Sequence, residues 1–136
     1  MTPTEKYQAM KTAMNNLTDI LENETSALRR GDFQTSLATH ADKMGAAITF
    51  QDTLSNLRTD LKNLAALPES TRRDLASRHK ALTCAVEQNL RALKDMQAAS
   101  ERLSRLVVGT LRQAALEKTP LPGRNQPLSV RFNQTI

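Results

Sequence analysis

The sequence predicts an all-α protein, in which an antiparallel helical hairpin and a long third helix form a three-helix, coiled-coil-like bundle. Two observations lead to this fold class. Apolar residues recur at alternating steps of three and four along most of the chain, which is the pattern of helices buried on one side. Aromatic residues make up only 3% of the 136 residues, and the apolar ones are mostly Leu, Ala and Met, which favour helices. We expect one domain at residues 1–118 and a flexible C-terminal tail at residues 119–136.

The first helix is predicted at about residues 4–30, with Thr4 as its N-cap. Gly31 is expected to end this helix, and Asp32 to cap the next one. A connection this short forces the two helices to lie antiparallel as a hairpin. The predicted buried stripe of the first helix consists of Tyr7, Met10, Met14, Leu17, Leu21 and Leu28.

The second and third helices are predicted at about residues 32–66 and 70–117, separated by Pro68. The third helix would be about 70 Å long at a rise of about 1.5 Å per residue. The predicted buried stripe of the second helix is Phe33, Leu37, Ala41, Met44, Ile48, Gln51, Leu54, Leu57, Leu61 and Leu64. That of the third helix is Leu75, His79, Leu82, Val86, Asn89, Leu93, Met96, Ser100, Leu103, Val107, Thr110 and Ala114.

The third helix is longer than either helix of the predicted hairpin, so its last turns are expected to extend past them. Those turns still carry an apolar stripe, and a soluble protein rarely leaves such a stripe bare. Three arrangements would cover it: the helix bends back, a second copy packs on it, or another protein's helix binds there. The stripe contains Leu103, Leu106, Val107, Leu111 and Leu116.

Glu24 interrupts the apolar stripe of the first helix. Because the hairpin turns at Gly31, a residue seven positions before the turn faces roughly seven positions after it, near Ala38. His40 and Lys43 then lie within about one turn of Glu24. We therefore expect a contact of Glu24 with Lys43 or with His40 that clamps the hairpin, with the lysine stem lying along the groove.

The sequence contains no pattern typical of an enzyme. It has no Gly-rich phosphate loop, no Cys/His cluster for zinc, and no Glu-x-x-His spacing for a di-metal site. We expect no catalysis, cofactor or metal ion.

The sequence has no run of about 18 apolar residues, so we expect no membrane span. The single cysteine, Cys84, is expected to be a partly buried filler, and with no signal peptide evident we expect a cytoplasmic location.

The positive charge is concentrated in the second half of the chain. The net charge is +5, with a surplus of one acidic residue in residues 1–66 and of six basic residues in residues 67–136. The basic residues are spread about one per turn along the third helix, without aromatic residues among them for base stacking. We therefore expect no nucleic-acid binding. The basic half could instead steer toward an acidic protein partner, or it could be a solvated face.

The stretch LTDILENETSALRRGDFQTSLATHADKMGAAI resembles the signature of FlgN-type flagellar export chaperones. That signature has leucines, a glutamate on the seam, an Ala-Leu pair, Gly-Asp at the turn and a lysine some eleven residues later. The order of three helices and the tail PLSVRFNQTI are also similar to this family, so that the resemblance covers most of the chain. The matching residues are Leu17, Leu21, Glu24, Ala27, Leu28, Gly31, Asp32, Lys43, Asn89 and Leu90.

The resemblance implies a cytoplasmic chaperone of flagellar type III export. Such proteins bind the disordered C-terminal helical segments of the hook–filament junction proteins and deliver them to the export gate. The implied client-binding residues are those of the C-terminal stripe of the third helix. In this family a tail aromatic, usually tyrosine, is tied to gate docking; the only aromatic of this tail is Phe132.

Two other readings stay open beside the chaperone. The chain could be a generic helical adaptor whose coiled-coil stripe self-associates, which a concentration-dependent mass would indicate. It could also be a basic nucleic-acid binder, which a steep salt dependence of binding would indicate. For the chaperone itself we expect a monomer.

Overall fold

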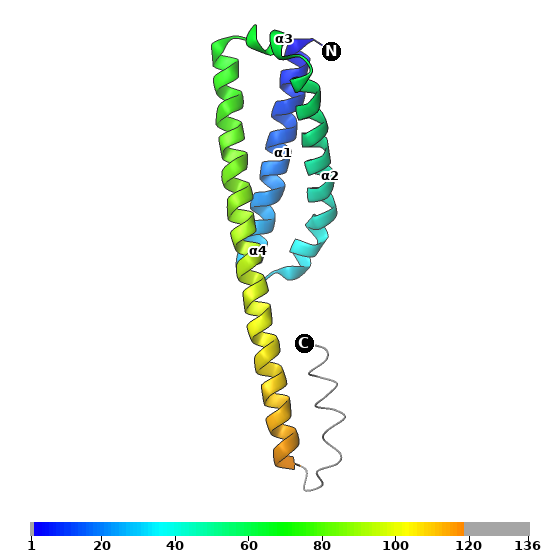
Figure 1. The fold of residues 1–136 in the computed structure, drawn as a ribbon, viewed down its shortest axis with the longest axis vertical. Coiled ribbons are helices and arrows are strands. Elements are labelled where there is room, and N and C mark those ends of the chain that lie inside the picture. The colour runs from blue at the N-terminus through cyan, green and yellow to red at the C-terminus, as the bar shows by residue number, and fades with distance from the viewer. Residues whose placement is uncertain (1, 119–136) are drawn as a thin grey trace. The chain divides into compact units, whose positions relative to one another are not determined.

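The computed structural model describes residues 2–118, and these residues form helices and no strand (Figure 1). The predicted all-α fold class is confirmed. The predicted tail and Phe132 lie outside the described residues. The helices of the described part are α1 (Pro3–Arg29), α2 (Phe33–Arg58), α3 (Leu61–Ala65) and α4 (Glu69–Lys118).

The chain divides into two compact units, Met1–Leu93 and Lys94–Ile136. The first unit holds α1, α2, α3 and the N-terminal half of α4, and the second holds the C-terminal half of α4. Within the first unit α1 and α2 lie side by side in opposite directions, joined by a tight turn (Figure 1). The predicted hairpin is therefore present.

Helix α1 begins at Pro3, one residue before the predicted start, and its N-cap is Thr2 and not Thr4. The Thr2 hydroxyl accepts a hydrogen bond from the backbone N–H of Glu5 at 3.2 Å, and the Glu5 carboxylate accepts one from the backbone N–H of Thr2 at 3.0 Å. This is a capping box, and Pro3 between them suits the first position of a helix because it has no N–H to leave unpaired. Thr4 is therefore an ordinary residue of the first turn.

The turn between α1 and α2 follows from Gly31, whose φ of 75° is one that other residues adopt only at a cost. Its N–H donates to the carbonyl of Leu28 at 3.1 Å, and the N–H of Asp32 donates to that of Ala27 at 2.8 Å. These two bonds form a Schellman motif. The Asp32 carboxylate then accepts the backbone N–H of Thr35 and so begins α2. One helix ends and the next begins within four residues, as the sequence predicts.

The predicted second helix is wrong in its length, because it breaks at Asp60 into α2 and the short α3. The backbone of Asp60 leaves the helical region, with φ −134° and ψ 46°. Its carboxylate accepts hydrogen bonds from the Lys6 ammonium of α1 and from the Asn63 side chain, both at 2.7 Å. These contacts compensate for the backbone bonds that the break removes.

The predicted stripe of α2 is right at Leu57, which is buried, and wrong over the first half of the helix, where Ala46 is buried instead. Phe50 is half-buried against the core. Apolar residues occur on two sides of this helix, so periodicity alone does not choose between them. The predicted stripe residues that are instead exposed include Phe33, Leu37, Ala41, Met44, Ile48 and Leu61.

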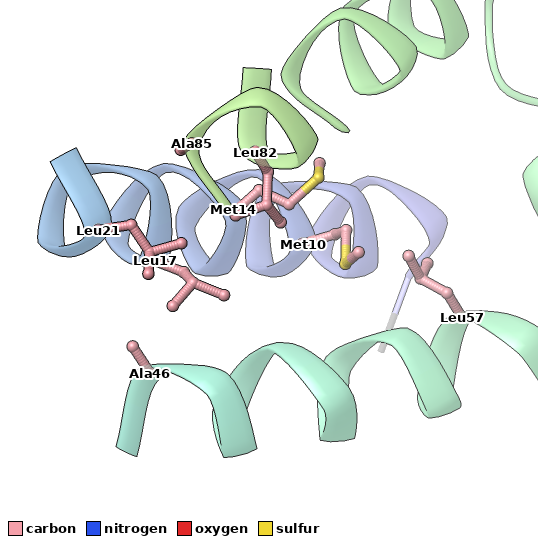
Figure 2. Packing of buried hydrophobic residues seen from close by; sticks show 8 residues of the cluster. All are labelled: Met10, Met14, Leu17, Leu21, Ala46, Leu57, Leu82 and Ala85. Atoms are coloured by element: carbon pink, nitrogen blue, oxygen red, sulfur yellow. The ribbon is translucent and has the colours of Figure 1, made fainter. Parts of the chain in front are cut away.

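The core of the first unit is built around α1 (Figure 2). Its large side chains lie between those of the neighbouring helices, with α4 on one side and α2 on the other. The cluster consists of Met10, Met14, Leu17 and Leu21 of α1, Ala46 and Leu57 of α2, and Leu82 and Ala85 of α4. The predicted stripe of the first helix is thus confirmed as the centre of the core.

The predicted stripe of α4 is right at Leu82 and Asn89, which are buried, and wrong at His79 and Val86, which are exposed. At these two turns the inward-facing position is one residue before the predicted one, as at Ala85 in place of Val86. Either choice of inward-facing residues keeps alternating steps of three and four, so the sequence pattern allows both. Cys84, predicted to be partly buried, is exposed as well.

Candidate functional site

The C-terminal half of α4 carries large apolar side chains that are open to solvent. Every predicted client-binding residue is exposed, whereas Val108 alone is buried among residues 94–117. The exposed fractions are 62% for Leu103, 69% for Leu106, 49% for Val107, 42% for Leu111 and 74% for Leu116.

Four of these five residues share one face of the helix. Leu103, Leu106, Val107 and Leu111 follow one another at steps that return to the same side of an α-helix. Leu116 lies about 140° from both Leu103 and Leu111, on the opposite side of the helix from the middle of this face. We define the apolar stripe of α4 as the first four residues.

Basic side chains flank this stripe. Residues 94–118 contain five Lys or Arg and three Asp or Glu, which gives a local charge of +2. The Arg105 guanidinium lies 4.0 Å from the Glu101 carboxylate, and both side chains are mostly exposed. This ion pair is therefore weak, and the Arg105 charge stays open to a partner. A partner segment that is apolar on one side and acidic at its edges fits these surroundings.

The clamp expected at Glu24 is present in the first unit. Lys43 of α2 donates to Glu24 Oε1 at 2.8 Å, and Asn89 of α4 donates to the same oxygen at 2.8 Å. Asn89 also reaches the Thr25 hydroxyl at 3.2 Å. Glu24 is 1% exposed and Asn89 is 3% exposed. One buried carboxylate oxygen therefore joins three helices.

The charge of Glu24 is maintained by its partners. Burial raises the pKa of the Glu24 carboxyl, but the hydrogen bonds from Lys43 and Asn89 and the charge of Lys43 outweigh burial, so that the pKa lies below its ordinary value of 4.5. His40, the alternative partner expected from the sequence, is exposed and contributes only a weaker charge effect on this pKa. Asn89 is a partner that the sequence did not assign to Glu24.

A second polar network ties α4 to α1 near the other end of the hairpin. The Tyr7 hydroxyl donates to the Asp74 carboxylate, and Arg78 bonds Asp74 at 3.0 Å and the side-chain oxygen of Asn15 at 2.8 Å. The hydrogen bonds from Tyr7 and Arg78 lower the pKa of Asp74, and the bond to Asp74 raises that of Tyr7. Sequence reasoning missed this network, for which the only signal was the placement of Tyr7 on the seam.

An open groove of about 600 Å³ lies between α1 and α4 within the first unit. Small side chains such as Ala81 and Ala85 line it, together with Cys84. Among residues 2–118, no three His, Cys, Asp or Glu side chains gather closely enough to hold a metal ion. None of the described helices is both long and apolar enough to span a bilayer.

Comparison of the chain with protein-family models, curated proteins and solved structures finds no match. The assignment of a function therefore depends on the residues themselves and on the surfaces just described.

Proposed function

We propose that this protein is a cytoplasmic export chaperone of the FlgN type, which binds the C-terminal helical segments of hook–filament junction proteins and delivers them to the flagellar export gate. The single observation that carries the proposal is the exposed apolar stripe of α4, Leu103, Leu106, Val107 and Leu111. The family resemblance of the hairpin supplies the identity of the client.

The stripe has the properties that an amphipathic helical client requires. It offers apolar side chains at helical spacing for the client's apolar face, and basic side chains beside them for acidic client residues. A client that is disordered when free would fold on this surface, so that burial of apolar area offsets the entropy lost on ordering. Leu116 is a peripheral contact in this proposal, because it faces away from the stripe.

The test is titration calorimetry of the full-length protein against C-terminal segments of hook–filament junction proteins. We expect one-to-one binding with a large negative heat-capacity change, and a gain of client helicity by circular dichroism. Leu103→Asp combined with Val107→Asp should weaken binding at least about 100-fold, because burying each such side chain is worth about 1.5–3 kcal/mol.

A matched variant separates lost apolar contact from added negative charge. Ala98→Asp with Gly109→Asp places the same two carboxylates at exposed positions on the side of the helix opposite the stripe. We expect it to bind the client within about tenfold of the unaltered protein. Absence of heat with every client segment, from a protein that is folded, would refute the chaperone function and leave a helical adaptor with another partner.

A further inference from the structure

Helix α2 presents a second apolar surface, in the first unit and separate from the stripe of α4. Four of its large side chains point away from the core: Phe33 is 52% exposed, Leu37 76%, Met44 50% and Ile48 55%. Ala38, Ala41 and Gly45 lie among them and are exposed. We define the outer face of α2 as Phe33, Gln34, Leu37, Ala38, Ala41, Met44, Gly45 and Ile48.

The outer face is continuous and carries no charge. At about 100° per residue, Ala41 lies opposite the side formed by Ala46 and Phe50, which packs on the core. Asp42 lies about 100° to one side of Ala41, and Lys43 points inward to Glu24. A soluble protein rarely exposes an uncharged face with several large apolar side chains unless a partner covers it.

We propose that this face binds the same face of a second copy of the chain, antiparallel and around a twofold axis that passes beside Ala41. About that axis, large side chains meet small ones: Leu37 faces Gly45 of the second copy, and Met44 faces its Ala38. Ala41 faces its own equivalent. Such alternation lets two helices approach closely and fill the space between them.

Gly45 has the room that this arrangement requires. A Cβ built on it would meet no atom within 4 Å, so the surface above it is open to an incoming side chain. In the proposed pairing that side chain is Leu37, the most exposed of the four large apolar residues of the face. Because the same patch serves both copies, the contact closes on itself and gives a dimer rather than a filament.

The charges at the two ends of the face select the antiparallel direction. Arg30 lies in the turn before α2 and Asp52 lies beyond Ile48, and both are exposed. An antiparallel pair brings Asp52 of one copy toward Arg30 of the other, whereas a parallel pair would place like charges together.

The size of the face indicates a weak dimer. It has about eight residues, fewer than the roughly 20–30 residues that each partner contributes to a stable interface, so we expect a dimer that dissociates at micromolar concentrations. This departs from the monomer expected from the sequence.

Disulfide crosslinking tests the geometry in the full-length chain. With Cys84→Ser to remove the native thiol, Ala41→Cys should form a covalent dimer under mild oxidation. Helices packed about 8–10 Å apart, with Cα atoms about 2.3 Å from each axis, bring facing Cα atoms to about 3.4–5.4 Å, which overlaps the range of roughly 4.4–6.8 Å that a disulfide needs. The control is Asp42→Cys in the same background, whose neighbouring and equally exposed thiol points aside and should crosslink at least about tenfold more slowly.

Sedimentation equilibrium tests the face without crosslinking. The mass of the unaltered protein should rise toward that of a dimer between about 1 µM and about 300 µM. Leu37→Glu should weaken dimerisation at least about tenfold, whereas Leu61→Glu, at an exposed leucine outside the face, should leave it unchanged. Both residues are exposed, so neither variant should unfold the chain.

Three outcomes would overturn the proposal. A mass that stays monomeric over this range, with no Ala41→Cys crosslink, would leave the face to a different protein. A dimer that survives Leu37→Glu but is lost with Leu103→Asp and Val107→Asp would place the interface on α4. Equal crosslinking of Ala41→Cys and Asp42→Cys would indicate random collision. The first and third outcomes leave the client-binding stripe of α4 untouched. The second would place self-association on that stripe, and the calorimetric titration with client segments then decides independently whether the stripe also binds a client.

Discussion

At the scale of single residues, Glu24 explains why an apolar stripe contains a carboxylate. Removing a charge from water is costly, and an ion pair seldom recovers more than that cost. Here one oxygen of the carboxylate accepts hydrogen bonds from both Lys43 of α2 and Asn89 of α4. A buried group with partners on two other helices admits few rotations of those helices. We infer that Glu24 specifies the alignment of the hairpin and α4 more than it stabilises them.

Lys43→Met tests this interpretation. It should lower the free energy of unfolding by about 2–4 kcal/mol, because it leaves a buried carboxylate with one partner fewer. Lys80→Met, at an exposed lysine of α4, should change it by less than about 0.5 kcal/mol. Both are measured by urea denaturation followed by circular dichroism.

The double variant Glu24→Leu with Lys43→Met should recover stability to within about 1 kcal/mol of the unaltered protein, since it removes both buried charges together. A Lys43→Met variant as stable as the Lys80→Met control would mean that the pair is unimportant.

At the scale of helices, α2 shows that apolar periodicity predicts a helix but does not by itself predict which of its sides is buried. The helix has apolar residues on two sides, and the small Ala46 faces the core while the large Leu37 and Ile48 face solvent. The longer of two apolar stripes is therefore not always the buried one. Lys43 must point inward to reach Glu24, and that single contact excludes the rotation that would bury the outer face.

Two alanine substitutions in α2 distinguish the rotations. Ala46→Asp should lower the free energy of unfolding by more than about 3 kcal/mol, because it places an unpaired charge in the core. Ala41→Asp, the same change at an exposed position, should cost less than about 1 kcal/mol at low protein concentration. Thermal or urea unfolding of the two variants measures the difference, and a reversed order would mean that α2 has the rotation predicted from the sequence.

At the scale of the whole molecule, the two kinds of surface belong to different units. The buried polar networks and the outer face of α2 lie in the first unit, and the apolar stripe of α4 lies in the second. Substitutions that weaken client binding should therefore leave the unfolding of the first unit nearly unchanged. Most of the positive charge lies in the second half of the chain, where the proposed client binds.

Deletion of residues 119–136 tests the proposed division of labour between α4 and the tail. Because the proposed client site is complete within residues 103–111, we expect calorimetric affinity for client segments to stay within about threefold. Export of the client in cells should fall, since the deletion removes Phe132, the residue proposed to dock at the export gate. Loss of binding on deletion would place part of the client site in the tail.

The sequence by itself determined the all-α class, the hairpin and the place of its clamp, but not the break of the second helix at Asp60. Gly31 and Asp32 specify a turn by local backbone chemistry, and a turn that short fixes which residues face each other, so that Lys43 or His40 could be expected beside Glu24 in advance. Only the tertiary structure decided which side of α2 and which setting of α4 are buried, and that Tyr7, Asp74 and Arg78 meet. The physical reason is that a repeat of three and four fits several rotations of a helix when apolar residues lie on more than one side. The choice among them depends on contacts between residues far apart in the chain, such as Arg78 with Asn15.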